Sequence, residues 1–144
     1  MRYLLPLLAA LLAGCAAVYS PAPGPVPEAV PPPETPVGSP AVVALFDSAR
    51  ADSAAGRLSN AAASLERALR IEPRNPRLWQ ELARVRLAQG QYAQAESLAA
   101  RSNSWAGGDA ALRADNWRLI AQARDARGDG AGAKAALDAA ERQK

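Results

Sequence analysis

The chain has 144 residues, a formal net charge of +3, no histidine and a single cysteine. This composition excludes Cys/His zinc sites, Ser-His-Asp triads, Cys-His dyads and any disulfide within one chain. Carboxylate pairs remain available for acid–base chemistry, but they need a shaped pocket, which alanine-rich helical arrays rarely build. The small charge and the seven Phe, Tyr and Trp residues give no reason to expect nucleic-acid binding. We expect no catalytic residues, metal, cofactor or small-molecule substrate.

Residues 1–14 have the pattern of a cleaved bacterial export signal. A positive charge precedes an apolar run over residues 4–12, which is too short to span a bilayer as a lone helix. The sequence Leu-Ala-Gly-Cys at 12–15 resembles the lipobox of bacterial lipoproteins. That resemblance implies cleavage before Cys15 and acylation of its thiol. An ordinary signal peptide that contains a cysteine is the alternative.

The residue after the cysteine bears on which membrane would hold the anchor. Two or three acyl chains, such as palmitate, anchor a protein stably, because each buried methylene contributes about 0.8 kcal/mol. In enterobacterial lipoproteins an Asp after the cysteine favours retention in the inner membrane, whereas this chain has Ala16. The resemblance implies an outer-membrane lipoprotein that faces the periplasm.

The segment 15–40 is dominated by proline. Nine prolines lie between Ser20 and Pro40. Proline fixes φ and donates no backbone hydrogen bond, so this stretch is predicted to be disordered and extended rather than packed. As polyproline II, at about 3.1 Å per residue, it would span up to roughly 65 Å. We interpret it as a tether; a PxxP ligand for an SH3-like domain is the alternative.

From residue 41 onward the chain is rich in alanine and arginine and repeats itself. Three glycines, separated by 34 and 38 residues, follow helical patterns: Gly56, Gly90 and Gly128. An alanine follows each glycine after five positions: Ala61, Ala95 and Ala133. Glycine takes the positive φ that ends a helix, and alanine lets two helix backbones approach closely. The pattern predicts three helical hairpins.

This spacing resembles the tetratricopeptide repeat (TPR) over residues 42–142. The second repeat carries the family's bulky and aromatic positions at Trp79, Leu82 and Tyr92, and Pro73 closes the first repeat. With Leu98, these large residues of the second repeat are expected to be core. A generic bundle of helical hairpins, which shares part of this pattern, is the alternative.

The TPR resemblance implies an all-α fold, a short right-handed solenoid of about three hairpins over 41–144. Four extra residues before the third repeat predict a lengthened helix with Asp109 as its N-cap. Trp105 stands where the first repeat has Ile71, and we expect it to be core. The last helix, expected over 131–142, would close the array with a polar outer face.

In this family ligands usually lie in the concave groove lined by the first helix of each hairpin. Carried over by position, the resemblance implies a partner-binding surface of Phe46, Arg50, Arg77, Gln80, Arg84, Leu87, Asp115, Arg118 and Gln122. Three of these, Arg50, Arg84 and Arg118, would form a basic stripe, and arginine binds carboxylates bidentately. Because the chain has fifteen Arg against two Lys, ordinary solvated arginines are the alternative. Arg67 and Arg70 are expected on a solvated outer face.

The order of anchor, proline-rich tether and small repeat domain is similar to that of the outer-membrane lipoprotein activators of bifunctional penicillin-binding proteins, in particular the pseudomonad form. The resemblance implies an adaptor that binds the periplasmic domain of a class A penicillin-binding protein and stimulates peptidoglycan synthesis. A TPR lipoprotein for outer-membrane assembly, of the pilotin or barrel-assembly type, is the alternative. A passive membrane–wall tether and a peptidoglycan hydrolase are further possibilities, although the sequence carries no hydrolase motif.

Overall fold

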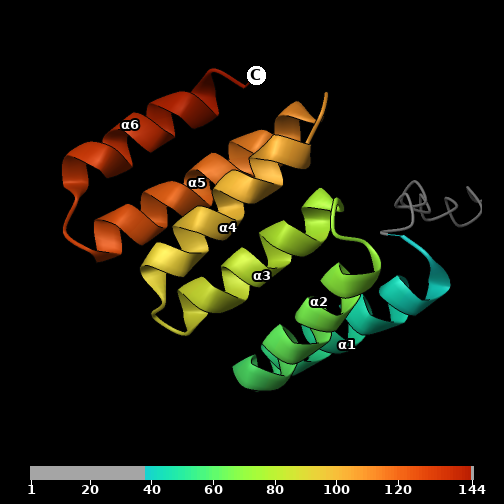
Figure 1. The fold of residues 1–144 in the computed structure, drawn as a ribbon. Helices are drawn as coiled ribbons and strands as arrows, with labels where there is room; N and C mark the ends of the chain where they lie inside the picture. The colour runs from blue at the N-terminus through green and yellow to red at the C-terminus, as the bar shows by residue number, and fades with distance from the viewer. Residues whose placement is uncertain (1–37, 144) are drawn as a thin grey trace, which may run out of the picture. The chain divides into compact units, whose positions relative to one another are not determined.

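The computed structural model describes residues 38–143, which form six helices (Figure 1). In chain order these are α1 (Pro40–Ala54), α2 (Leu58–Ile71), α3 (Pro76–Ala88), α4 (Tyr92–Trp105), α5 (Ala110–Ala126) and α6 (Gly130–Glu141). The predicted all-α fold is confirmed. The predicted signal peptide, Cys15 and all but the end of the predicted tether lie outside the described residues. None of the six described helices is both long enough and apolar enough to cross a membrane.

The helices pack as three successive hairpins, α1 with α2, α3 with α4 and α5 with α6. Helix α3 also packs on α2, and α5 packs on α4 and, less extensively, on α3. The chain order is therefore the packing order, as Figure 1 shows from the blue-green α1 to the red α6. The extensive contacts of α6 are with α5 alone.

The turn inside each hairpin depends on one glycine in the left-handed region. Gly56 and Gly90 have φ of 73° and Gly128 has φ of 82°. A residue with a Cβ is strained at these angles, whereas glycine is not. The three turn glycines expected from the sequence are confirmed.

Side-chain oxygens cap the starts of α3, α5 and α6. The Asp109 carboxylate accepts a hydrogen bond from the backbone N–H of Leu112 at 2.9 Å and begins α5. Helix α5 has 17 residues against 13 for α3, so both the lengthened helix and its predicted cap are confirmed. Helix α6 begins at Gly130, one residue before the predicted start, where Asp129 caps it.

The first helix begins at Pro40, the last residue of the predicted tether. Proline suits a first helical turn, where its missing N–H has no acceptor to serve. The backbone N–H of Ser39 donates to Glu72 Oε1 at 2.7 Å, and the Asn75 side-chain amide donates to Glu72 Oε2 at 2.9 Å. The Ser39 bond, followed by the Asn75 bond, lowers the pKa of Glu72. One carboxylate therefore joins the start of α1 to the turn between α2 and α3.

The apolar core forms two clusters along the array. The first joins α1, α2 and α3, and the second joins α3, α4, α5 and α6. Leu98 packs against both clusters. Ala61, Ala95 and Ala133 are all buried, as expected where helices cross closely. Among the expected core residues, Leu82 is buried, and Trp79, Tyr92 and Leu98 are half-buried.

A buried polar network joins the second and third hairpins. Asn116 of α5 donates to Ser102 Oγ at 2.7 Å and to Asn103 Oδ1 at 2.9 Å. Ser102 in turn donates to the backbone carbonyl of Pro76 at 2.8 Å. Both Asn116 and Ser102 are fully buried. Because a buried polar group without a partner is costly, this chain of bonds fixes α5, α4 and the start of α3 in one register.

Candidate functional site

The surface predicted along α1, α3 and α5 is only partly exposed. Arg50, Arg84 and Arg118 are exposed, as are Arg77 and Gln122. Phe46, Leu87 and Asp115 are half-buried. Phe46 packs against the first core cluster and Leu87 against the second. Most of the predicted positions therefore remain open to a partner.

Gln80 is the exception, because it is only 8% exposed. It holds the same repeat position in α3 that Arg118 holds in α5. Helix α5, the first helix of the next hairpin, packs on α3, whereas no further hairpin follows the α5–α6 hairpin in the described residues. The placement of Gln80 on a partner-binding surface was therefore wrong. That position is covered wherever another hairpin follows.

The arginines of this surface do not form a purely basic stripe. Arg84 lies 3.8 Å from Glu81, and Arg118 lies 2.7 Å from Asp115. Arg50 has no acidic partner at this distance in the described part of the chain; its guanidinium lies 6.0 Å from the Phe46 ring centroid. Exposed ion pairs of this kind contribute about 0–1 kcal/mol. A carboxylate on a partner could therefore compete for these arginines at little cost.

A second candidate surface was not expected from the sequence. Trp105, at the end of α4, is 39% exposed, and Ile71, at the end of α2, is 51% exposed. The guanidinium of Arg74 lies 5.3 Å from the Trp105 ring centroid. The expectation that Trp105 is core was wrong, although its alignment with Ile71 explains why both are exposed: each ends the second helix of a hairpin.

The neighbouring Trp79 is arranged similarly. Its indole N–H donates to the carbonyl of Pro73 at 2.8 Å, and Arg101 lies 4.8 Å from its ring centroid. We define the Trp–Arg surface as Ile71, Arg74, Trp79, Arg101 and Trp105. Tryptophan and arginine are the residues most enriched among the energetic centres of protein interfaces. The signal that could have found this surface is the presence of two tryptophans near helix ends and two arginines close to them in the sequence, Arg74 before α3 and Arg101 in α4.

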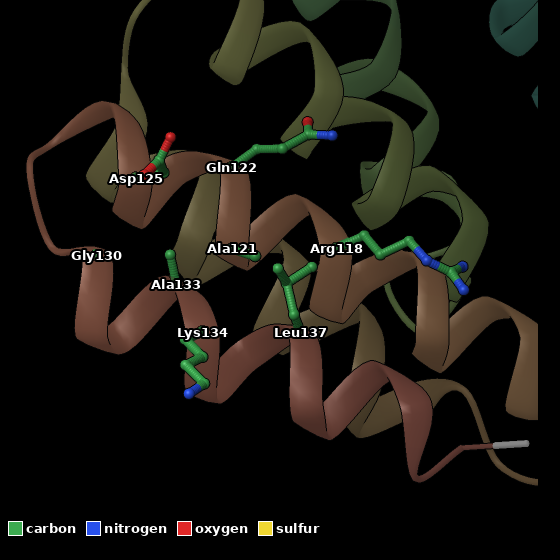
Figure 2. Close-up of a pocket in the computed structure, with 8 residues that line it drawn as sticks. All are labelled: Arg118, Ala121, Gln122, Asp125, Gly130, Ala133, Lys134 and Leu137. Carbon is green, nitrogen blue, oxygen red and sulfur yellow. The ribbon is translucent and has the colours of Figure 1, made fainter.

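A groove of about 470 Å³ runs between α5 and α6 (Figure 2). Its lining includes Arg118, Gln122 and Asp125 of α5 and Ala133, Lys134 and Leu137 of α6. Figure 2 shows Leu137 pointing from α6 toward Ala121 of α5. Two predicted partner-binding residues, Arg118 and Gln122, therefore line this groove. The contribution of α6 to its lining was not predicted.

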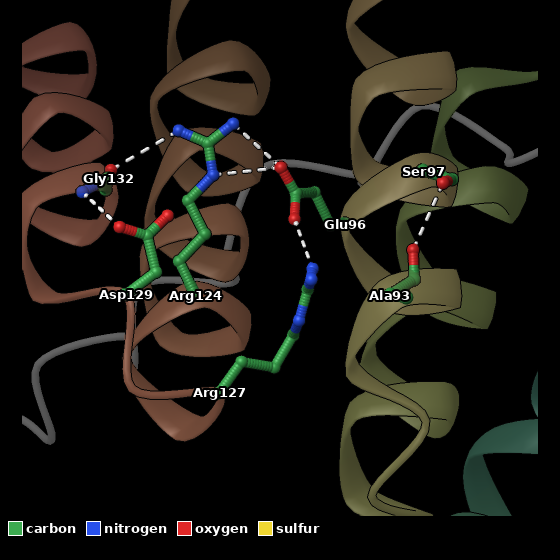
Figure 3. Close-up of polar contacts among 7 residues, drawn as sticks. All are labelled: Ala93, Glu96, Ser97, Arg124, Arg127, Asp129 and Gly132. Atoms are coloured by element: carbon green, nitrogen blue, oxygen red, sulfur yellow. Dashed lines mark hydrogen bonds and ion pairs between the residues drawn. The ribbon is translucent and has the colours of Figure 1, made fainter.

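Ion pairs cross from one hairpin to the next. The Arg124 guanidinium lies 2.7 Å from Glu96, and Arg127 lies 3.3 Å from the other oxygen of the same carboxylate (Figure 3). Arg86 of α3 lies 2.5 Å from Glu66 of α2 in the preceding hairpin. Arg86 and Arg124 hold the same repeat position. They fix the register between hairpins rather than offer a free binding site.

Within residues 38–143 no group of three His, Cys, Asp or Glu side chains could hold a metal ion. The carboxyl of Glu72, whose pKa is lowered, serves the start of α1. The chemistry that the surface offers is that of arginine, tryptophan and leucine side chains, which suits protein recognition.

Fold and surface together define a helical-repeat module for protein interaction. The model of the tetratricopeptide repeat matches residues 53–115. The solved globular C-terminal domain of P. aeruginosa LpoP is 50% identical to this chain, with a TM-score of 0.70; the match covers 98% of that domain and 72% of this chain. The chain therefore belongs to the same TPR family as this LpoP domain. No curated protein matches the chain.

Proposed function

We propose that this protein is an outer-membrane lipoprotein that binds a class A penicillin-binding protein and activates its synthesis of peptidoglycan. The observation that carries the proposal is the 50% identity to the C-terminal domain of LpoP over 98% of that domain. The architecture read from the sequence supports it, since its order of anchor, tether and repeat domain is similar to that of the lipoprotein activators. Acyl chains on Cys15 would hold the protein in the membrane, and the proline-rich segment would give the repeat domain its reach into the periplasm.

The surface along α1, α3 and α5 is the proposed contact with the synthase. Arg50, Arg84 and Arg118 are exposed along it. The planar guanidinium bonds a carboxylate through two parallel N–H donors, which makes such contacts directional. Replacing Arg84 or Arg118 with Glu would leave a like-charge repulsion against an acidic partner surface.

The test uses the unlipidated chain, residues 16–144, and the purified cognate synthase. Binding is measured by surface plasmon resonance, and glycan polymerisation from lipid-linked precursor is followed in the same preparation. We expect saturable binding and a severalfold faster polymerisation. Arg84→Glu should weaken both by about tenfold, the effect of an interface residue worth about 1.4 kcal/mol. Arg67→Glu, on the exposed face of α2, is the matched control and should leave both unchanged.

Two results would overturn this proposal. Absence of both binding and stimulation by a folded protein would refute the synthase as partner. Affinity capture from membrane extracts that recovers a secretin or a barrel-assembly component, and no synthase, would assign the adaptor to outer-membrane assembly instead. Unchanged binding by both Arg84→Glu and Arg118→Glu would move the contact to another surface of the domain.

A further inference from the structure

The way in which each hairpin packs on the preceding one indicates what the third hairpin can bind. Helix α3 lies on the first hairpin and buries Leu78, Leu82 and Val85 against it. These residues have the i, i+4, i+7 spacing of one helix face. Helix α5 lies on the second hairpin and buries Asn116, Ile120 and Ala123 at the same three repeat positions. Each of the first two hairpins therefore carries the next helix on one defined surface.

The third hairpin presents that same surface uncovered. Leu65 of α2, Ala99 of α4 and Leu137 of α6 share one repeat position, nine residues after the turn glycine. Leu65 and Ala99 are 0% exposed beneath the following helix, whereas Leu137 is 50% exposed. Leu137 lines the groove between α5 and α6 together with Ala133 (Figure 2). The same apolar position is therefore buried in the first and second hairpins and exposed in the third.

The charge on this surface differs from that on the earlier hairpins. Arg86 and Arg124, one residue after the buried positions of Val85 and Ala123, each pair with a glutamate of the preceding hairpin. The two glutamates hold different repeat positions: Glu66 lies ten residues and Glu96 six residues after the turn glycine, and at these positions α6 has Asp138 and Lys134. Lys134 lines the groove. A helix placed on α6 as α5 is placed on α4 would therefore need an acidic residue toward Lys134 where α5 has Arg124 toward Glu96.

A second copy of the chain is a poor occupant. Its α1 is the helix whose face remains uncovered, and the three matching positions there are Ala44, Ser48 and Ala51, all exposed. Ser48 would replace the buried Leu82 of α3 or Ile120 of α5, which removes most of the apolar contact. Asp52 holds the position of Arg86, but it already lies 2.8 Å from Arg57.

We propose that the α5–α6 surface binds an amphipathic α-helix of a partner protein, which occupies the place of a seventh helix. The bound helix carries large apolar residues at i, i+4 and i+7 and an acidic residue at i+8 that faces Lys134. Its apolar residues cover Leu137 and the alanines beside it. This inference is independent of the synthase named above, because it rests on the packing of the chain's own hairpins.

The probe is a synthetic peptide of α3, residues 76–89, with Arg86→Glu. An Arg77→Lys change in the peptide permits a lactam bridge to Glu81, which holds the peptide helical. Residues 16–144 are titrated with it and followed by two-dimensional NMR and by calorimetry. We expect saturable binding with amide shifts confined to α5 and α6. A peptide that keeps Arg86 should bind about threefold more weakly, since Arg86 would face Lys134 across an exposed ion-pair position.

Variants of the protein separate this surface from the rest of the molecule. Leu137→Asp should weaken peptide binding at least about tenfold, because it places a charge at this exposed apolar position. Ala63→Asp, at an exposed position of α2 outside both candidate surfaces, should leave binding unchanged. No binding up to about 1 mM peptide, shifts centred on α2 and α3, or equal binding by Leu137→Asp would overturn the proposal. Self-association in analytical ultracentrifugation that Leu137→Asp abolishes would overturn it in favour of a second copy.

Discussion

Replacing the leucine at one repeat position should have very different costs in α2 and α6. Leu65 and Leu137 are the same residue at the same place in their hairpins, but Leu65 is 0% and Leu137 is 50% exposed. Leu65→Ala removes three buried carbons and leaves a cavity between α2 and α3, which costs about 3 kcal/mol. Leu137 is half exposed, so its replacement by alanine loses only about half of the transfer free energy of the side chain and leaves no enclosed cavity. Leu137→Ala should therefore cost about 1 kcal/mol.

Urea unfolding of residues 16–144, followed by circular dichroism, measures both changes. With a slope of about 1.5 kcal/mol per molar urea, Leu65→Ala should lower the midpoint by about 2 M and Leu137→Ala by about 0.7 M. Equal shifts for the two variants would refute the reasoning, because they would mean that the end of the array is as well covered as its middle. The mild effect expected for Leu137 also keeps its variants folded and usable in binding experiments.

Three further changes test other contacts of the fold. Asn116→Ala should cost about 3 kcal/mol and Ser102→Ala about 1.5 kcal/mol in urea unfolding, with the double variant costing less than the sum because the two share a hydrogen bond. Gly90→Ala should cost about 1 kcal/mol, since φ there is 73° and alanine is strained at that angle. Gly108, which has no positive φ and has open space where a Cβ would stand, is the control: a thermal midpoint that falls less for Gly90→Ala than for Gly108→Ala would contradict this. Glu72 contributes stability above its unfolded pKa that is lost as pH falls through its lowered folded pKa. Unfolding free energies at pH 7 and pH 3 should therefore differ less for Glu72→Gln than for the unmodified protein, and an equal or larger difference for the variant would refute that role.

The repeat could be read from the sequence because its determinants are local. The φ that Gly56 must adopt, the small side chain needed at Ala61 and the cap supplied by Asp109 each depend on a few neighbouring residues. Residue type alone constrains such positions strongly. The six helices and the longer α5 followed from these signals.

The surface was harder to predict, because burial in a repeat array depends on what comes next. Gln80 and Arg118 hold one repeat position, yet the first is covered by α5 and the second is open. Position along the array, and not residue type, decides this case. Trp105 was expected to be core because it aligns with Ile71, but both residues are exposed where their helices end, and Arg74 lies over the Trp105 ring.

The one-sided packing of α1 and α6 gives the ends and the middle of this small array different rates of local opening. In a linear array each helix resists local opening in proportion to the neighbours that hold it. Helices α3 and α4 have extensively packed neighbours on two sides, whereas α1 has one, α2, and α6 has one, α5. Amide hydrogens of α1 and α6 should therefore exchange with solvent sooner than those of the middle hairpin. A molecule that binds against α6 supplies the missing neighbour and slows the exchange of the α6 amide hydrogens. The exchange rate of α6 therefore measures binding at this surface without any added label.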